Sequence, residues 1–94
     1  MNAGGKEYLE SVKVANAYGL HARPAAEFVK LANRFEAEIF VGKDGLEVNG
    51  KSIMGVMMLA ADRGSTLEIK ACGLDAEAAV KALVKLVAGG FGED

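Results

Sequence analysis

The sequence predicts an α+β fold of two layers, in which a four-stranded sheet is covered on one face by three helices. Four short segments alternate polar and apolar residues at the period of a strand, and three others repeat apolar residues at helical spacing. Their order along the chain is βαββαβα. Alternating strands indicate a sheet with one buried face, and helices with one apolar stripe each indicate a single covering layer.

The first half of the chain predicts a strand, a helix and a second strand. Residues 11–15 alternate, with Val12 and Val14 on one face, and residues 37–42 alternate in the same way. Between them, residues 22–35 have a helical pattern in which Pro24 occupies the first turn, where its missing N–H costs nothing. The apolar stripe of this helix consists of Phe28, Leu31, Ala32 and Phe35.

The second half predicts a hairpin, a short helix, a strand and a long helix. Asp44-Gly45 is a strong signal for a two-residue turn into a strand at residues 46–49. Ser52 is expected to cap a helix over residues 53–59, and Asp75 to cap a final helix that ends at Gly89. Buried positions are expected in the strand of residues 66–72 and in the final helix, namely Leu67, Ile69, Ala71, Ala76, Ala79, Val80, Leu83 and Val87.

Length and composition bound the class of protein. A chain of 94 residues with 51% apolar content is expected to form a single domain over residues 1–94, with residues 1–6 and 90–94 flexible. A net charge of −2 offers no overall attraction to nucleic acid. The longest apolar stretch, residues 52–61, is too short to cross a bilayer, and a single cysteine fits a reducing compartment. We therefore expect a cytoplasmic monomer that neither inserts into membranes nor binds nucleic acid.

The only histidine, His21, lies where a helix is predicted to begin. A lone histidine at such a place is most often a helix-capping residue without chemistry. Here, however, Gly19 permits a sharp turn into the helix, and the first-turn amides of Ala22 and Arg23 are free to bind phosphate oxygens. The guanidinium of Arg23 adds a charge suited to phosphate. These features favour a histidine that carries a phosphoryl group.

Two motifs resemble those of one known family. The run Gly19-Leu20-His21-Ala22-Arg23-Pro24-Ala25 resembles the active-site signature of the HPr family, phosphocarriers of the bacterial phosphoenolpyruvate-dependent phosphotransferase system. The run Lys51-Ser52-Ile53-Met54-Gly55-Val56-Met57 resembles the regulatory serine segment of that family, at the expected separation from the histidine. The family fold, an open-faced β-sandwich of four antiparallel strands and three helices, is similar to the one predicted above.

The resemblance implies a carrier rather than an enzyme. In that case His21, assisted by Arg23, accepts a phosphoryl group on Nδ1 from the phosphohistidine of Enzyme I and passes it to enzyme IIA proteins in sugar uptake. No cofactor and no metal site are implied in this chain, because Mg²⁺ belongs to the partner reactions. Phosphoryl transfer depends mostly on positioning and charge stabilisation, so one histidine and one arginine can suffice when the partner supplies the rest.

The resemblance also implies regulation and a docking surface. Ser52 corresponds to the serine phosphorylated by HPr kinase/phosphorylase, a function compatible with its predicted role as a helix cap. The short helix is apolar nearly all round, so we expect Val56 and Leu59 to be buried and part of the rest to be exposed. The expected partner-binding residues are Pro24, Lys30, Ile53, Met54 and Met57.

Three alternatives remain open at this stage. The nitrogen-regulatory branch of the phosphotransferase system has a relative of HPr that resembles this chain in the histidine motif and the Gly-Phe…Glu-Asp tail. A nucleic-acid module would need exposed aromatic residues on the open sheet face, where Phe40 is the one candidate. A hydrolase would need a second catalytic group near His21. Cys72 is expected to be partly exposed at a strand end, and we assign it no reactivity.

Overall fold

The computed structural model describes residues 6–93, and the elements follow the predicted order βαββαβα with a short 3₁₀ helix added at the end. No helix among these residues is both long and apolar enough to cross a bilayer. The elements are β1 (Lys6–Lys13), α1 (Ala22–Ala32), β2 (Glu38–Lys43), β3 (Leu46–Asn49), α2 (Ile53–Met58), β4 (Thr66–Gly73), α3 (Ala76–Ala88) and η1 (Gly90–Gly92).

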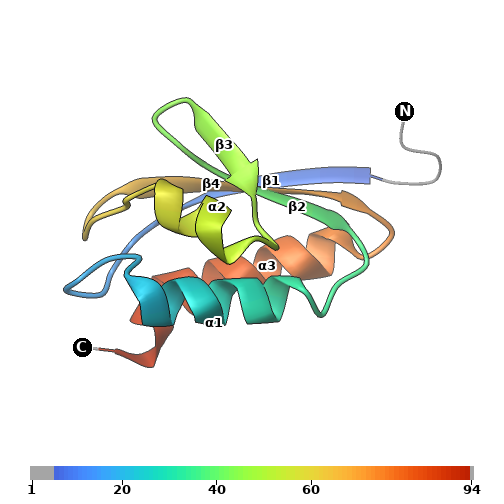
Figure 1. Ribbon diagram of the computed structural model, residues 1–94. Coiled ribbons are helices and arrows are strands. Elements are labelled where there is room, and N and C mark those ends of the chain that lie inside the picture. The colour runs from blue at the N-terminus through green and yellow to red at the C-terminus, as the bar shows by residue number, and fades with distance from the viewer. Residues whose placement is uncertain (1–5, 94) are drawn as a thin grey trace.

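The four strands form one sheet in the order β1-β4-β2-β3, and every neighbouring pair is antiparallel. The three helices lie on one side of this sheet and leave the other side open (Figure 1). The predicted two-layer, open-faced arrangement is therefore confirmed. Asp44 and Gly45, both with positive φ (51° and 86°), form the predicted turn between β2 and β3.

The hydrophobic core fills the space between the sheet and the helices. Phe28 of α1 is fully buried, and it is the largest such side chain in the described part of the chain. Alternation along β4 buries Leu67, Ile69 and Ala71, as predicted. The predicted stripe of α3 is also buried at every position, namely Ala76, Ala79, Val80, Leu83 and Val87. Burial of these side chains removes apolar surface from water and so holds α1 and α3 against the sheet.

The first strand is longer than the sequence predicts, and it includes Lys6, for which the sequence predicts a flexible start over residues 1–6. This residue begins β1 and pairs with Gly73, so that β1 matches β4 over its full length. The alternation of polar and apolar residues does not reveal this extension, because apolar Leu9 points to the open face and charged Glu10 lies on the helix side. On that side, Glu10 Oε2 lies 3.9 Å from Lys81 Nζ. Residues 1–5 lie outside the described residues.

Asp75 stands at the N-terminal boundary of α3, as predicted, but its carboxylate does not cap that helix. Instead it accepts hydrogen bonds from the backbone N–H groups of Glu36 (2.9 Å) and Ala37 (2.8 Å). The bond from Glu36, followed by that from Ala37, lowers the pKa of Asp75 against the opposing effect of burial. Asp75 therefore fastens the α1–β2 connection to the start of α3.

The sequence predicts a flexible tail over residues 90–94, and the structure places a short 3₁₀ helix at the start of this segment. Gly90–Gly92 form η1, and the ring of Phe91 packs against the core. Glu93 follows with backbone and side-chain hydrogen bonds to other segments, whereas Asp94 lies outside the described residues. The physical reason for this ordered backbone is Phe91, an apolar residue that packs against the core. The rest of the segment is polar and rich in glycine, and this composition is typical of a flexible tail.

A tight loop before α1 positions the helix start. Gly19 adopts φ +64°, and a Cβ at this position would lie 2.2 Å from the carbonyl oxygen of Ala61. The next residue, Leu20, is buried and its N–H donates to that same oxygen at 2.8 Å. The loop is thus hydrogen-bonded to the connection between α2 and β4, and glycine is required at the point of closest approach.

We predict that Gly19→Ala destabilises the protein by about 2–4 kcal/mol, measured by urea unfolding. The added methyl group both strains the left-handed backbone and forces the Leu20–Ala61 hydrogen bond apart. Gly64→Ala is the matched control, because Gly64 also has positive φ (+88°) but nothing lies within 4 Å of its Cβ position. The control should cost only about 1 kcal/mol. Equal losses in the two variants would contradict the assigned role of close packing at Gly19.

Candidate functional site

His21 is the N-cap residue of α1, so the predicted position of the histidine at the helix start is confirmed. Its backbone is extended (φ −72°, ψ −175°), and its carbonyl oxygen accepts the first helical hydrogen bond, from Ala25 at 3.0 Å. The N–H groups of Ala22 and Arg23 precede that bond and have no acceptor within the helix. The imidazole therefore stands beside two free amides at the positive end of the helix dipole.

The surroundings of His21 are open. Its side chain is 41% exposed, and the ring of Tyr18 lies edge-on to the imidazole, with centroids 6.4 Å apart. A hollow of about 390 Å³ is lined by Tyr18, His21, Arg23, Gly92 and Glu93. A shallow hollow of this kind fits a reacting group presented by a partner protein better than a small substrate that must be enclosed.

Glu93 lies in this site, although the sequence did not single it out. Its Oε1 lies 3.1 Å from His21 Nε2 and accepts a hydrogen bond from Asn16 Nδ2, also at 3.1 Å. Its Oε2 lies 4.0 Å from Arg23 Nη1. The bond to His21, the bond from Asn16 and the nearby charges of His21 and Arg23 lower the pKa of Glu93, while burial opposes them. The one sequence signal was Phe91, an apolar residue between two glycines in the tail.

Arg23 reaches the same hollow as His21, as the sequence predicts. Its side chain is 78% exposed, and its one charged neighbour among the described residues is the carboxylate of Glu93. An exposed guanidinium paired this loosely is free to turn toward an incoming phosphate, because surface ion pairs contribute about 0–1 kcal/mol. The structure therefore brings His21, Arg23 and Glu93 together around one solvent-accessible point.

Ser52 caps α2, as predicted. Its backbone is extended and its Oγ accepts a hydrogen bond from the N–H of Gly55 at 3.1 Å. Ser52 as a whole residue is half-buried. This geometry confirms the structural role of Ser52; its regulatory phosphorylation stays a prediction.

The short helix α2 exposes most of its apolar side chains. Val56 and Leu59 are buried, as predicted, whereas Ile53, Met54 and Met57 are exposed by 42%, 74% and 43%. Met58, which the sequence reasoning did not single out, is exposed by 67%. We call Ile53, Met54, Met57 and Met58 the α2 patch. A six-residue helix set against one face of a sheet cannot bury residues on all of its sides.

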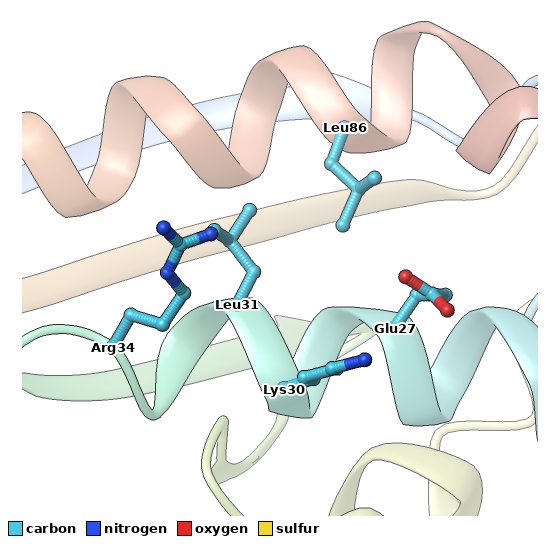
Figure 2. A pocket seen from close by; sticks show the side chains of 5 residues that line it. All are labelled: Glu27, Lys30, Leu31, Arg34 and Leu86. Atoms are coloured by element: carbon cyan, nitrogen blue, oxygen red, sulfur yellow. The ribbon is translucent and has the colours of Figure 1, made fainter.

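Two of the predicted partner-binding residues lie elsewhere. Pro24 is fully buried, which corrects the prediction, because the first turn of α1 turns this ring toward the core. Lys30 is exposed but lines a groove between α1 and α3, with Glu27, Leu31, Arg34 and Leu86 (Figure 2). No residue of the α2 patch lines that groove, so the structure does not group Lys30 with the patch.

The open sheet face gives little support to the other functional classes. The Phe40 ring is covered by Lys70, whose Nζ lies 5.2 Å from the ring centroid and 3.1 Å from Glu47. Cys72 is half-buried at the end of β4; burial, followed by the nearby charge of Glu7, raises the pKa of its thiol. Within residues 6–93, no three His, Cys, Asp or Glu side chains are grouped so that they could hold a metal ion.

Comparison with known families decides the assignment. Residues 9–89 match the family described as the PTS HPr component phosphorylation site. The chain belongs to the HPr family. HPr proteins are phosphocarriers of the phosphotransferase system, and the match includes both His21 and Ser52.

Several individual HPr proteins are close to this chain. The phosphocarrier protein HPr of Neisseria meningitidis serogroup A is 45% identical over 84 residues, which are 89% of this chain and 94% of the relative. The HPr-like protein Crh of Halalkalibacterium halodurans is 50% identical over 83% of this chain and 93% of its own.

Solved structures of HPr share the fold. An HPr from Thermoanaerobacter tengcongensis has a TM-score of 0.89 at 46% identity, covering 93% of this chain and 98% of its own. A dimer of HPr from the same organism has a TM-score of 0.74 at 49% identity, covering 87% of this chain and 94% of its own. The arrangement of four antiparallel strands and three helices is thus that of HPr.

Proposed function

We propose that this HPr accepts a phosphoryl group on His21 from the phosphohistidine of Enzyme I and passes it to enzyme IIA proteins in sugar uptake. The observation that supports this function best is the exposed imidazole at the start of α1, beside the free amides of Ala22 and Arg23. These groups and the Arg23 guanidinium can receive the phosphate oxygens, while the protein supplies no enclosed pocket for a small substrate.

The geometry also favours Nδ1 as the atom that is phosphorylated. Nε2 of His21 faces Glu93 at 3.1 Å, and no hydrogen bond involves Nδ1 in the described part of the chain. A carrier must also release its load. The helix-end interaction contributes only about 0.3–1 kcal/mol at an exposed site, so the phosphoryl group is stabilised without being trapped.

Intact-mass analysis after incubation with phosphoenolpyruvate, Mg²⁺ and a sugar-branch Enzyme I tests this function. We expect one acid-labile phosphoryl group on the wild type and none on His21→Ala. Arg23→Ala should still be phosphorylated, but at a rate at least about tenfold lower, because the variant lacks the guanidinium that would bind the phosphate oxygens. Phosphorylation by the nitrogen-branch Enzyme I alone would assign the protein to the nitrogen-regulatory branch. No modification by either enzyme would reject the carrier function.

The α2 patch is the proposed docking surface for Enzyme I and the IIA proteins. It presents adaptable methionine side chains, and exposed apolar groups of this kind usually mark a contact with a partner. Lys30 is proposed to contribute only as a charge at the edge of that surface.

We predict that Met54→Ser raises the KM for Enzyme I about fivefold and leaves kcat nearly unchanged, since truncation at an interface typically costs about 1 kcal/mol. Leu74→Ser serves as the control, because Leu74 is 92% exposed but lies in the β4–α3 connection. Steady-state kinetics of phosphorylation measure both variants. A larger effect at Leu74 than at Met54 would place the docking surface elsewhere.

Ser52 is the proposed site of regulatory phosphorylation by HPr kinase/phosphorylase. A phosphate on its Oγ would add about two negative charges beside Ile53 and Met54, at the edge of the docking surface. We expect this charge to weaken the approach of acidic partners, and the helix N-terminus to tolerate it.

A pair of variants separates this charge effect from the loss of the helix cap. Ser52→Asp and Ser52→Asn both keep a good capping side chain, but only the first adds a charge. We predict that Ser52→Asp slows phosphorylation of His21 by Enzyme I at least about tenfold at low salt, whereas Ser52→Asn stays close to the wild-type rate. Equal rates for the two variants would argue against electrostatic regulation at Ser52.

We further propose that the protein works as a cytoplasmic monomer without bound cofactor, metal ion or nucleic acid. The alternative is self-association of the kind known for the HPr dimer from T. tengcongensis. Light scattering across a range of protein concentrations decides between these two states.

A further inference from the structure

Two adjoining hollows form one continuous groove between α1 and α3. The first, of about 290 Å³, is lined by Glu27, Lys30, Leu31, Arg34 and Leu86. The second, of about 340 Å³, is lined by Leu31, Ala82, Lys85, Leu86, Gly89 and Gly92. The two hollows share Leu31 and Leu86, which point toward each other across the gap between the helices (Figure 2). We call the two hollows together the α1–α3 groove.

The middle of the α1–α3 groove is apolar. Leu31 and Leu86 are both half-buried, and Leu86 belongs neither to the core nor to the apolar side chains packed against it. Ala82 and Gly89 have a small side chain or none, so α3 leaves space beside Leu86. Leu86 therefore presents apolar surface that the fold itself does not use, and such surface in a concave place marks a contact.

The border of the groove is cationic. Lys30 and Arg34 stand four residues apart on α1, Lys85 lies on α3, and all three are exposed. Among residues 6–93, none of these three side chains forms an ion pair with a carboxylate. Like charges four residues apart on a helix repel each other. The groove is thus lined by three positive charges and one negative charge, that of Glu27, on a chain whose net charge is −2.

These features favour an acidic protein segment over other anionic partners. The two leucines lie recessed between the helices, whereas binding to a membrane surface needs apolar side chains that protrude into the lipid. No aromatic side chain lines the groove, so it offers no stacking surface for bases. A segment with apolar side chains between carboxylates matches both the leucines and the surrounding cations.

We propose that the α1–α3 groove is a second docking surface, which binds an acidic segment of a partner protein through its apolar side chains and carboxylates. This inference goes beyond phosphoryl transfer and does not require it. No residue of the α2 patch lines the groove, so a partner bound there leaves the patch free. Gly92 lines both the groove and the hollow at His21, so the groove extends to the edge of the histidine site.

An NMR titration of the full, unphosphorylated chain labelled with ¹⁵N tests the inference. The probe is a short capped peptide of alternating Glu-Glu and Leu-Leu pairs, and the control peptide has Lys-Lys in place of Glu-Glu. At low salt we expect the acidic probe to bind with a Kd below about 1 mM and to shift the backbone amides of Leu31, Arg34 and Leu86. The amides of Met54 and Met57 should not move, and the basic peptide should not bind.

Charge variants show whether the groove itself holds the probe. Arg34→Glu and Lys85→Glu should each raise the Kd at least about fivefold at low salt, and added salt should reduce the difference. Arg63→Glu makes the same change of charge at an exposed residue of the α2–β4 connection and should bind like the wild type. Leu86→Ser should also weaken binding, but Leu86 is half-buried, so the exposed Arg34 decides the test.

Several results would overturn the inference. These are an acidic probe that leaves the groove amides unmoved, or an Arg34→Glu variant that binds no more weakly than Arg63→Glu. Groove shifts that appear without peptide as the protein concentration rises would instead make this face a contact between copies of the chain. Binding to phosphatidylglycerol vesicles but not to the acidic probe would make it a membrane contact. Each of these results rejects an acidic protein segment as the occupant and leaves the proposed phosphoryl transfer at His21 untouched.

Discussion

Burial of one face of the β1-β4-β2-β3 sheet is the constraint from which the rest of the structure follows. Leu67, Ile69 and Ala71 of β4 can leave water only if helices cover them, and α1 and α3 supply that cover with Phe28 and the α3 stripe. A chain of 94 residues has enough helix for one face, so the other face remains open. The position of α1 in this layer determines where its N-terminus, and hence His21, lies.

Three segments that are distant in sequence meet at the N-terminus of α1: the loop before α1, the connection between α2 and β4, and the C-terminal segment. The loop before α1 is fastened by the Leu20–Ala61 hydrogen bond, and the C-terminal segment arrives through the packing of Phe91. None of the three encloses the imidazole. The result is a rigidly placed but exposed side chain, and this combination suits a protein whose reactions are completed by the groups of its partners.

The electrostatics of the site are moderate. One carboxylate, that of Glu93, lies beside both the imidazole and the Arg23 guanidinium, and these contacts are partly open to solvent. Strong burial of the pair would hold a phosphoryl group or a carboxylate too firmly for rapid exchange between partners. Exposure to solvent keeps each of these ion pairs weak.

Local patterns of residues were sufficient to predict much of this protein. Helical and alternating periods predicted every strand and α-helix, the buried stripe of α3 and the partial exposure of the apolar residues of α2, while the sequence around His21 and Ser52 placed both residues at helix starts. These features depend on neighbours within a few residues of each other, which is why they can be read from the chain. Predictions from the sequence failed where a residue's contacts are made by segments far away in the chain.

Only the tertiary structure decided that Lys6 pairs with Gly73, that Asp75 bonds to the backbone of Glu36, and that Glu93 reaches His21. Each of these contacts joins positions that are far apart in sequence and have no periodic relation to each other. Their partners are set by how the layers pack, and packing is a property of the whole chain. The amino-acid sequence by itself therefore determined the family, the order of the elements and the position of His21 at a helix start, whereas the tertiary structure decided which carboxylate lies beside that histidine.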